Sequence, residues 1–280
     1  MRTVFDLSGI AELQPLAEIV RAIHGAADDE TDKWLIVGAT ARELILRHAY
    51  KLDEGRRTED LDIAMPAGSW HSVEVVEKRL IAGGAEHART SRRQFKLHGW
   101  KIDILPFGGI EEDGVVLWPP DQDTAMSVVG FEEASQHAFE VILPGATRAF
   151  VASPPGLLIL KLIAWSERHL DRPHHDAVDL RALLQSYAGR WNEDRLYDEA
   201  DDLLQRFEYD NELAGAALIG RDSAAIAFPN TLDRIRTIVA RDLAGESFGL
   251  AADMGGRVSD NINLLRALLT GLQDAALSRR

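Results

Sequence analysis

The chain has 280 residues, no cysteine and a formal net charge of −14 at pH 7. Without cysteine it can form neither a disulfide framework nor a cysteine-ligated zinc site. The acidic balance argues against a general nucleic-acid binder, because neutralisation of phosphates drives that affinity. No apolar run reaches spanning length, and the first residues lack a basic region followed by an apolar stretch. We therefore expect a cytoplasmic protein with no membrane partner.

The first residues predict an amphipathic helix and then a strand–turn–helix unit. Apolar residues at helical spacing predict a helix over Ser8–His24. Residues 34–38 indicate a short buried strand, and residues 38–46 show helical spacing again. The small residues of the turn would let backbone N–H groups and the helix N-terminus approach a phosphate. An ordinary turn with a flexible Gly38 is the alternative.

The most informative pattern is the run from Arg56 to Met65. On a strand, Asp60 and Asp62 would share one face, while Leu61 and Ile63 would point into the core. Two hard oxygen ligands on a rigid element suit a divalent cation such as Mg²⁺. A solvated strand end is the alternative.

A helix is predicted next, over Ser69–Ala82, with Ser69 as its N-cap and two glycines at its end. Alternating patterns and turn residues then predict strands that complete a sheet. These strands lie near residues 86–90, 93–98, 101–106, 126–131, 137–143 and 147–151, and a hairpin arm spans Gly114–Trp118.

One of these strands carries a third carboxylate. Asp103 would face away from Ile102 and Ile104. If this strand lies beside that of Asp60 and Asp62, three carboxylates converge, which is enough for two metal ions in a phosphoryl displacement. An aspartate that caps a neighbouring loop is the alternative.

Positive charge gathers near the same place in an otherwise acidic chain. This face is either a solvated hairpin surface or an electrostatic funnel for a triphosphate or an RNA end. The residues are Arg56, Arg57, Arg89, Arg92, Arg93, Lys96 and Lys101.

A different pattern begins at Ser153, which fits an N-cap followed by proline in the first helical turn. We therefore expect two domains, residues 1–152 and residues 153–280. The second reads as a helical bundle, with a glycine-containing loop over 244–258. Its later helices are predicted at 174–187, 193–206, 210–219, 230–243 and 259–277.

Lys161 lies on a mostly apolar helix of this second part. A lysine there either extends its ammonium group to the surface or serves a charged partner. Asp176 and Asp179 lie one helical turn apart and share a face. They would position Lys161 or Arg168, or form a solvated acidic face.

The order of a Gly turn, an Asp-x-Asp strand and a later Asp strand resembles the polymerase-β-like nucleotidyltransferase superfamily. Its commonest turn is Gly-Gly or Gly-Ser, so Gly38-Ala39 departs at the second residue. Arg56-x-Thr58-x-Asp60-Leu61-Asp62 resembles more closely the AbiEii-like abortive-infection toxin nucleotidyltransferases. The segment Leu160–Arg168 is similar to their Lys motif, and His175–Leu180 to their Asp-rich helix, with His175 where Lys or Arg is frequent. The resemblance covers roughly residues 30 to 185.

This resemblance implies an α/β fold with an N-terminal nucleotidyltransferase-type mixed sheet and flanking helices, followed by a C-terminal all-α bundle. It implies a metal-dependent enzyme that moves a nucleoside monophosphate from a nucleoside triphosphate to an acceptor hydroxyl and releases pyrophosphate. Two Mg²⁺ ions, or Mn²⁺, would be held by the catalytic carboxylates Asp60, Asp62 and Asp103. The nucleotide would be bound by Gly38, Ala39, Thr40, Arg42, Arg56, Thr58, Lys161 and Asp176.

The resemblance also suggests partners. The acceptor would be the 3′ end of a tRNA or a protein residue, and an antitoxin protein would be the cognate partner. Two alternatives stay open. A small hydroxylated acceptor such as an aminoglycoside would suit the acidic chain. A non-catalytic nucleotide-binding module is the other, and the intact set of Asp60, Asp62 and Asp103 argues against it.

Overall fold

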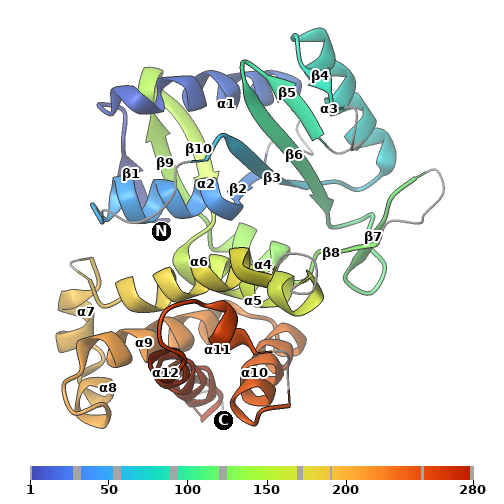
Figure 1. Cartoon of the computed structure of the whole chain (residues 1–280). Helices are drawn as coiled ribbons and strands as arrows, with labels where there is room; N and C mark the ends of the chain where they lie inside the picture. The colour runs from blue at the N-terminus through green and yellow to red at the C-terminus, as the bar shows by residue number, and fades with distance from the viewer. Residues whose placement is uncertain are drawn as a thin grey trace. The chain divides into compact units, whose positions relative to one another are not determined.

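A computed structural model gives the fold and describes residues 2–27, 33–52, 58–88, 94–119, 125–168, 173–189, 191–246 and 249–277. The chain contacts divide it into two compact units, Met1–Ser153 and Pro154–Arg280. The first is a sheet with helices and the second is helical (Figure 1). The predicted fold class, a mixed α/β sheet followed in sequence by a helical bundle, is confirmed.

The described residues of the first unit form an eight-stranded sheet in the order β1-β9-β10-β2-β3-β6-β5-β4. It is mixed, because β3 pairs with β2 antiparallel and with β6 parallel. Its strands are β1 (Val4–Asp6), β2 (Leu35–Val37), β3 (Asp60–Pro66), β4 (Glu86–His87), β5 (Gln94–Leu97), β6 (Trp100–Phe107), β9 (Phe139–Leu143) and β10 (Thr147–Val151). A separate two-stranded ribbon consists of β7 (Val115–Leu117) and β8 (Ala125–Ser127).

Helices connect these strands. The longest are α1 (Gln14–Ala26), which packs against β10, and α3 (Trp70–Ala82), which packs against α1. The predicted N-cap of α3 is confirmed, since Ser69 Oγ accepts a hydrogen bond from the Ser72 N–H at 3.3 Å. The others are η1 (Ala11–Leu13), α2 (Gly38–Arg42), the π-helical η2 (Glu43–Ala49), α4 (Phe131–Gln136) and η3 (Pro144–Ala146).

Alternation along β3 follows the predicted pattern. Leu61 and Ile63 are 0% and 1% exposed, whereas Asp60 is exposed and Asp62 is half-buried. The apolar residues of β3 therefore anchor the strand in the core, and the aspartates emerge on its opposite face.

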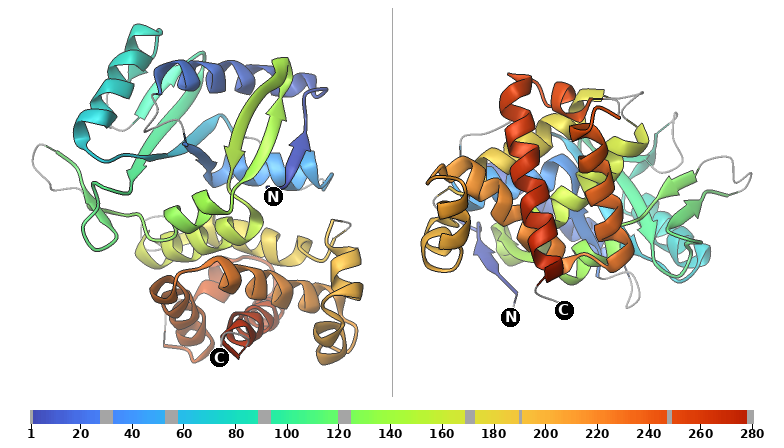
Figure 2. Two further views of the ribbon diagram at one scale, coloured as in Figure 1. Left: turned by 180° about the vertical axis from the view of Figure 1, so that it is seen from behind. Right: turned by 90° about the horizontal axis from the view of Figure 1, so that it is seen from below.

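The second unit is a helical bundle whose central helices are α9 (Asn211–Ile226) and α12 (Val258–Leu277). A Cβ added at Gly271 would lie 1.8 Å from Ala217 O, so glycine allows these two backbones to touch. Figure 2 shows α12 beside α10. The remaining helices are α5 (Pro154–Arg168), α6 (Pro173–Ser186), α7 (Glu193–Asp198), α8 (Asp201–Arg206), α10 (Pro229–Leu243) and α11 (Leu250–Asp253). No described helix is both long enough and apolar enough to cross a membrane.

Several predicted boundaries are wrong. The first α-helix begins at Gln14 rather than Ser8, because Pro15 fits only in a first helical turn. The strand predicted near 126–131 is β8, which ends at Ser127 and lies outside the main sheet. Residues 131–136 form the unpredicted helix α4. Strand β1 was not among the predicted elements.

The predicted helix over 193–206 is two helices, α7 and α8, separated at residues 199–200. The predicted loop over 244–258 contains the short helix α11. Helix α9 continues to Ile226, beyond the predicted end at 219, because its alanine- and glycine-rich turns pack against α12.

Candidate functional site

The parallel pairing of β3 and β6 places two of the predicted carboxylates side by side. Figure 1 shows β3 beside β6. In their register Asp62 lies opposite Asp103, and Asp60 lies opposite Lys101. Neighbouring strands are roughly 4.8 Å apart, so Asp62 and Asp103 emerge next to each other on one face of the sheet. Asp60 shares that face, two residues earlier. We call Asp60, Asp62 and Asp103 the carboxylate site.

Gly38 lies directly against this site. It follows Val37, which pairs with Asp62 across β2 and β3. Its φ is +66°, and a Cβ at this position would lie 2.1 Å from Asp62 Oδ2. Glycine is therefore required twice, once for the left-handed backbone and once for the close approach. Helix α2 begins at this residue, so its first turn starts beside a carboxylate.

Two threonines of the predicted nucleotide set hold the backbone of Asp60. Thr40 Oγ1 donates to the Asp60 carbonyl at 2.7 Å, and Thr58 Oγ1 accepts from the Asp60 N–H at 3.0 Å. The Thr58 N–H in turn donates to Glu43 Oε2 at 3.3 Å. These contacts fix the start of β3, a role that the sequence analysis did not assign to them.

The neighbouring strands add two contacts to the carboxylates. Lys101 Nζ lies 3.1 Å from Asp60 Oδ1, with both side chains about half exposed. Gln94 Nε2 donates to Asp103 Oδ2 at 3.2 Å and reaches Oδ1 at 3.4 Å. Gln94 was missed, because its position opposite Asp103 depends on the β5–β6 register, which the sequence alone does not reveal.

The donor set suits a hard divalent cation. Carboxylate oxygens are the ligands that Mg²⁺ takes in proteins, and the absence of a side chain at Gly38 lets Asp62 Oδ2 occupy the space that a Cβ would fill. Among the described residues, no group of three or more His, Asp or Glu side chains is arranged so that it could hold a metal ion. The carboxylate of Asp60 is paired with the ammonium group of Lys101. This positive charge neutralises Asp60 as a bound cation would.

The structure describes only some of the other residues that were predicted near this site. Ala39 is half-buried in α2, and Arg42 of the same helix is 7% exposed. Lys96 and Lys101 are exposed cross-strand neighbours. The remaining predicted cations lie outside the described residues: Arg56, Arg57, Arg89, Arg92 and Arg93.

In the second unit, Lys161 forms a compact ionic network. Its Nζ lies 2.9 Å from Asp176 Oδ1 and 2.7 Å from Asp179 Oδ2. Arg168 donates through Nε and Nη2 to both oxygens of Asp176, at 2.9 and 3.1 Å. Lys161 is 9% exposed and Asp176 2%. The expected pairing of Lys161 with both aspartates is present.

This network keeps its members charged. Burial alone would lower the pKa of Lys161, but Asp179 and Asp176 outweigh it and raise that pKa above its usual value. Burial would raise the pKa of Asp176, whereas Lys161 and Arg168 hold it below its usual value. Two cations and two anions therefore balance within α5 and α6.

Comparisons with known proteins identify a family. A family model described as "Nucleotidyl transferase AbiEii toxin, Type IV TA system" matches residues 21–255. No curated protein matches the chain. Among solved structures, the antibiotic-resistance factor ANT(2'')-Ia is similar at 14% identity and a TM-score of 0.38. That match covers 70% of this chain and 96% of that one, and a likeness this distant has no bearing on the activity.

Proposed function

The chain belongs to the family of AbiEii nucleotidyltransferase toxins of type IV toxin–antitoxin systems, and from this premise we propose a Mg²⁺-dependent transfer reaction. A nucleoside monophosphate passes from a nucleoside triphosphate to an acceptor hydroxyl, and pyrophosphate leaves. The observation that supports this most is the alignment of Asp62 with Asp103, with Gly38 packed on Asp62.

In this proposal the carboxylate site holds the divalent ions, which would neutralise charge on the reacting phosphates. Asp103, held by Gln94, takes the proton of the acceptor hydroxyl as the new oxygen–phosphorus bond forms. The bond between the α-phosphorus and the pyrophosphate oxygen breaks in the same displacement. Gly38 and the first turn of α2 offer backbone N–H groups to the triphosphate.

The nucleotide set completes the proposal. Arg42, Arg56 and Lys161 would offset the charge that develops on the triphosphate. Lys161 has three N–H donors, of which Asp176 and Asp179 occupy two. We infer that the third is the donor for a phosphate oxygen, and that Asp176 serves the nucleotide by holding Lys161.

We propose that the acceptor is an RNA end, such as the 3′ end of a tRNA, and that the protein acts in the cytoplasm under control of an antitoxin. The family description supports a toxin. The adjacent Lys96 and Lys101, on the strands that flank Asp103 and Asp60, favour a polyanionic acceptor by local charge.

The test is transfer of label. Purified protein is incubated with Mg²⁺, total cellular RNA and each α-labelled nucleoside triphosphate in turn, beside Asp60→Ala/Asp62→Ala. Glu59→Gln is the matched control, because it removes an exposed carboxylate next to Asp60 in the sequence that is not part of the carboxylate site. We expect label on RNA with wild type and control only.

Label on a small cationic acceptor or on the protein itself, with none on RNA, would contradict the RNA acceptor but keep the transfer chemistry. Nucleotide binding without any release of pyrophosphate would contradict the enzyme.

A further inference from the structure

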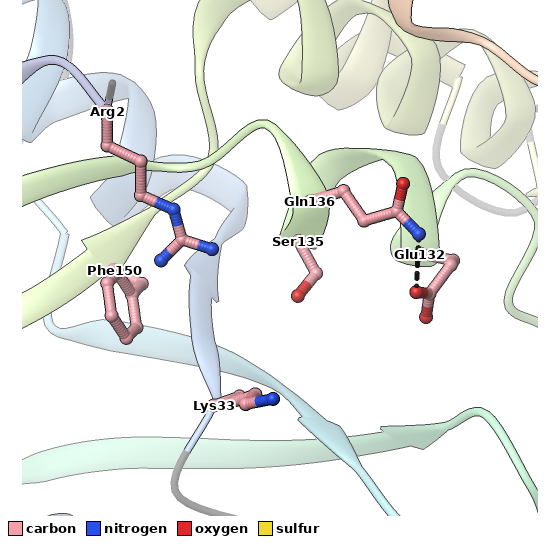
Figure 3. A pocket seen from close by; sticks show the side chains of 6 residues that line it. All are labelled: Arg2, Lys33, Glu132, Ser135, Gln136 and Phe150. Atoms are coloured by element: carbon pink, nitrogen blue, oxygen red, sulfur yellow. Dashed lines mark hydrogen bonds between the residues drawn. The ribbon is translucent and has the colours of Figure 1, made fainter.

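The first unit contains a polar cavity of about 190 Å³ between α4 and β10, apart from the carboxylate site. It is lined by Arg2, Lys33, Glu132, Ser135, Gln136 and Phe150 (Figure 3). We call it the α4 cavity. Lys33 precedes β2, whereas Gly38 follows it, so five residues of extended chain, roughly 16 Å, separate the cavity from the carboxylate site.

Two cations face this cavity. The guanidinium of Arg2 lies 4.5 Å from the centroid of the Phe150 ring, a stacking that orients its donors. The exposed Lys33 is directed toward the same space (Figure 3). Among the residues that the structure describes, neither Arg2 nor Lys33 belongs to an ion pair, which is notable in a chain of net charge −14.

The other side of the cavity offers a hydroxyl and a partly engaged carboxylate. Ser135 points into the space from α4 (Figure 3). Glu132 Oε1 accepts a hydrogen bond from Gln136 Nε2 at 2.8 Å, which holds that carboxylate along the helix. With Arg2 and Lys33 positive and Glu132 negative, the cavity carries one net positive charge.

Size and chemistry favour a small anion. A volume of about 190 Å³ lies below the roughly 300–1,000 Å³ of pockets for drug-sized ligands. A phosphate group fits within it. Arginine presents a planar fork that binds phosphate oxygens in pairs, and lysine adds a point charge. The Ser135 hydroxyl can donate to a third oxygen.

We propose that the α4 cavity binds one phosphate group, between Arg2, Lys33 and Ser135. The group is inorganic phosphate, one end of pyrophosphate, or a phosphate of the RNA backbone. This site goes beyond the transfer reaction and does not depend on it.

The test is a ³¹P NMR titration of the full chain with inorganic phosphate, in the presence of a chelator so that no divalent ion takes part. Arg2→Gln and Lys33→Gln remove one charge each while largely keeping side-chain length. Arg148→Gln is the matched control, because Arg148 is an exposed arginine of β10 that pairs with Glu140 and does not line the cavity. We expect saturable binding that weakens at least tenfold in each cavity variant and is unchanged in the control.

Absence of saturable binding, or equal weakening by Arg148→Gln, would overturn the proposal. Asp60→Ala/Asp62→Ala should still bind phosphate, and loss there would refute the assignment to this cavity. Displacement of bound phosphate by a short oligoribonucleotide would assign the group to RNA, and displacement by pyrophosphate alone would assign it to free phosphate.

Discussion

At the scale of single residues, Gly38 has the least tolerance for change. We predict that Gly38→Ala lowers label transfer at least tenfold, because the new Cβ would collide with Asp62 Oδ2. The left-handed φ of +66° adds a cost of roughly 1 kcal/mol in stability. Gly25→Ala is the control, since Gly25 lies in α1 with nothing near its Cβ position. That change should stabilise by about 0.5–1 kcal/mol. Wild-type activity in Gly38→Ala would show that Asp62 can move without consequence.

Gln94 is a positioning residue for Asp103 in this account. We predict that Gln94→Leu raises the Mg²⁺ concentration needed for half-maximal transfer several-fold, because Asp103 loses the amide that orients it. Mn²⁺ affinity, measured directly, should weaken in parallel. Gln14→Leu is the matched control, since that amide also donates to a carboxylate, Glu18, at 3.0 Å but lies on α1. An unchanged Mg²⁺ requirement in Gln94→Leu would remove Gln94 from the site.

At the scale of elements, the sequence predicted the faces of strands better than their pairing. Along the alternation from Asp60 to Ile63, only one choice of faces buries the apolar side chains. The sequence could therefore predict that the two aspartates share the opposite face. That Asp103 lies beside them depends on the parallel crossover between β3 and β6, which only the folded sheet determines. Short elements such as α4 and β1 were missed because they are too short to show a period.

Helix α3 has a carboxyl group that titrates near neutrality. Burial, with a contribution from Glu74, raises the pKa of Glu77 from 4.5 to about 7. A carboxyl with a raised folded pKa favours the folded state when protonated, so stability should fall as the pH rises from about 4.5 to about 7. We predict that Glu77→Gln raises the melting temperature at pH 8 by a few degrees, roughly 1 kcal/mol, with little change at pH 4.5. Equal shifts at both pH values in thermal scans would refute this titration.

The contact between α5 and α6 depends on Lys161. We predict that Lys161→Met destabilises the chain by about 3–5 kcal/mol. Asp176 would stay buried without one of its two cationic partners. Lys78→Met is the matched control. Lys78 also pairs with a carboxylate, Glu74, at 3.4 Å, but both side chains are mostly exposed, so its loss should cost under about 1 kcal/mol. Urea unfolding measures both, and similar losses would show that burial of the pair is unimportant.

At the scale of the whole molecule, the negative charge is unevenly distributed along the chain. Residues 193–212 contain nine acidic and two basic residues, so this segment carries seven of the 14 net negative charges. It belongs to the second unit. An acidic chain can therefore still present a lysine pair, Lys96 and Lys101, beside the carboxylate site. Composition and periodicity predicted that a sheet unit precedes a helical unit in the sequence. They did not predict the acceptor, since no single segment of sequence encodes it.

The central claim is that the carboxylate site binds divalent ions for nucleotidyl transfer, and direct counting of bound Mn²⁺ tests it. Electron paramagnetic resonance would follow a Mn²⁺ titration of wild type, Asp62→Asn, Asp103→Asn and the neighbouring Glu59→Gln, each with a nucleoside triphosphate analogue. We predict protein-dependent Mn²⁺ binding in wild type and Glu59→Gln that is lost in both aspartate variants. Equal Mn²⁺ binding in all four proteins would place the ions elsewhere and contradict the account.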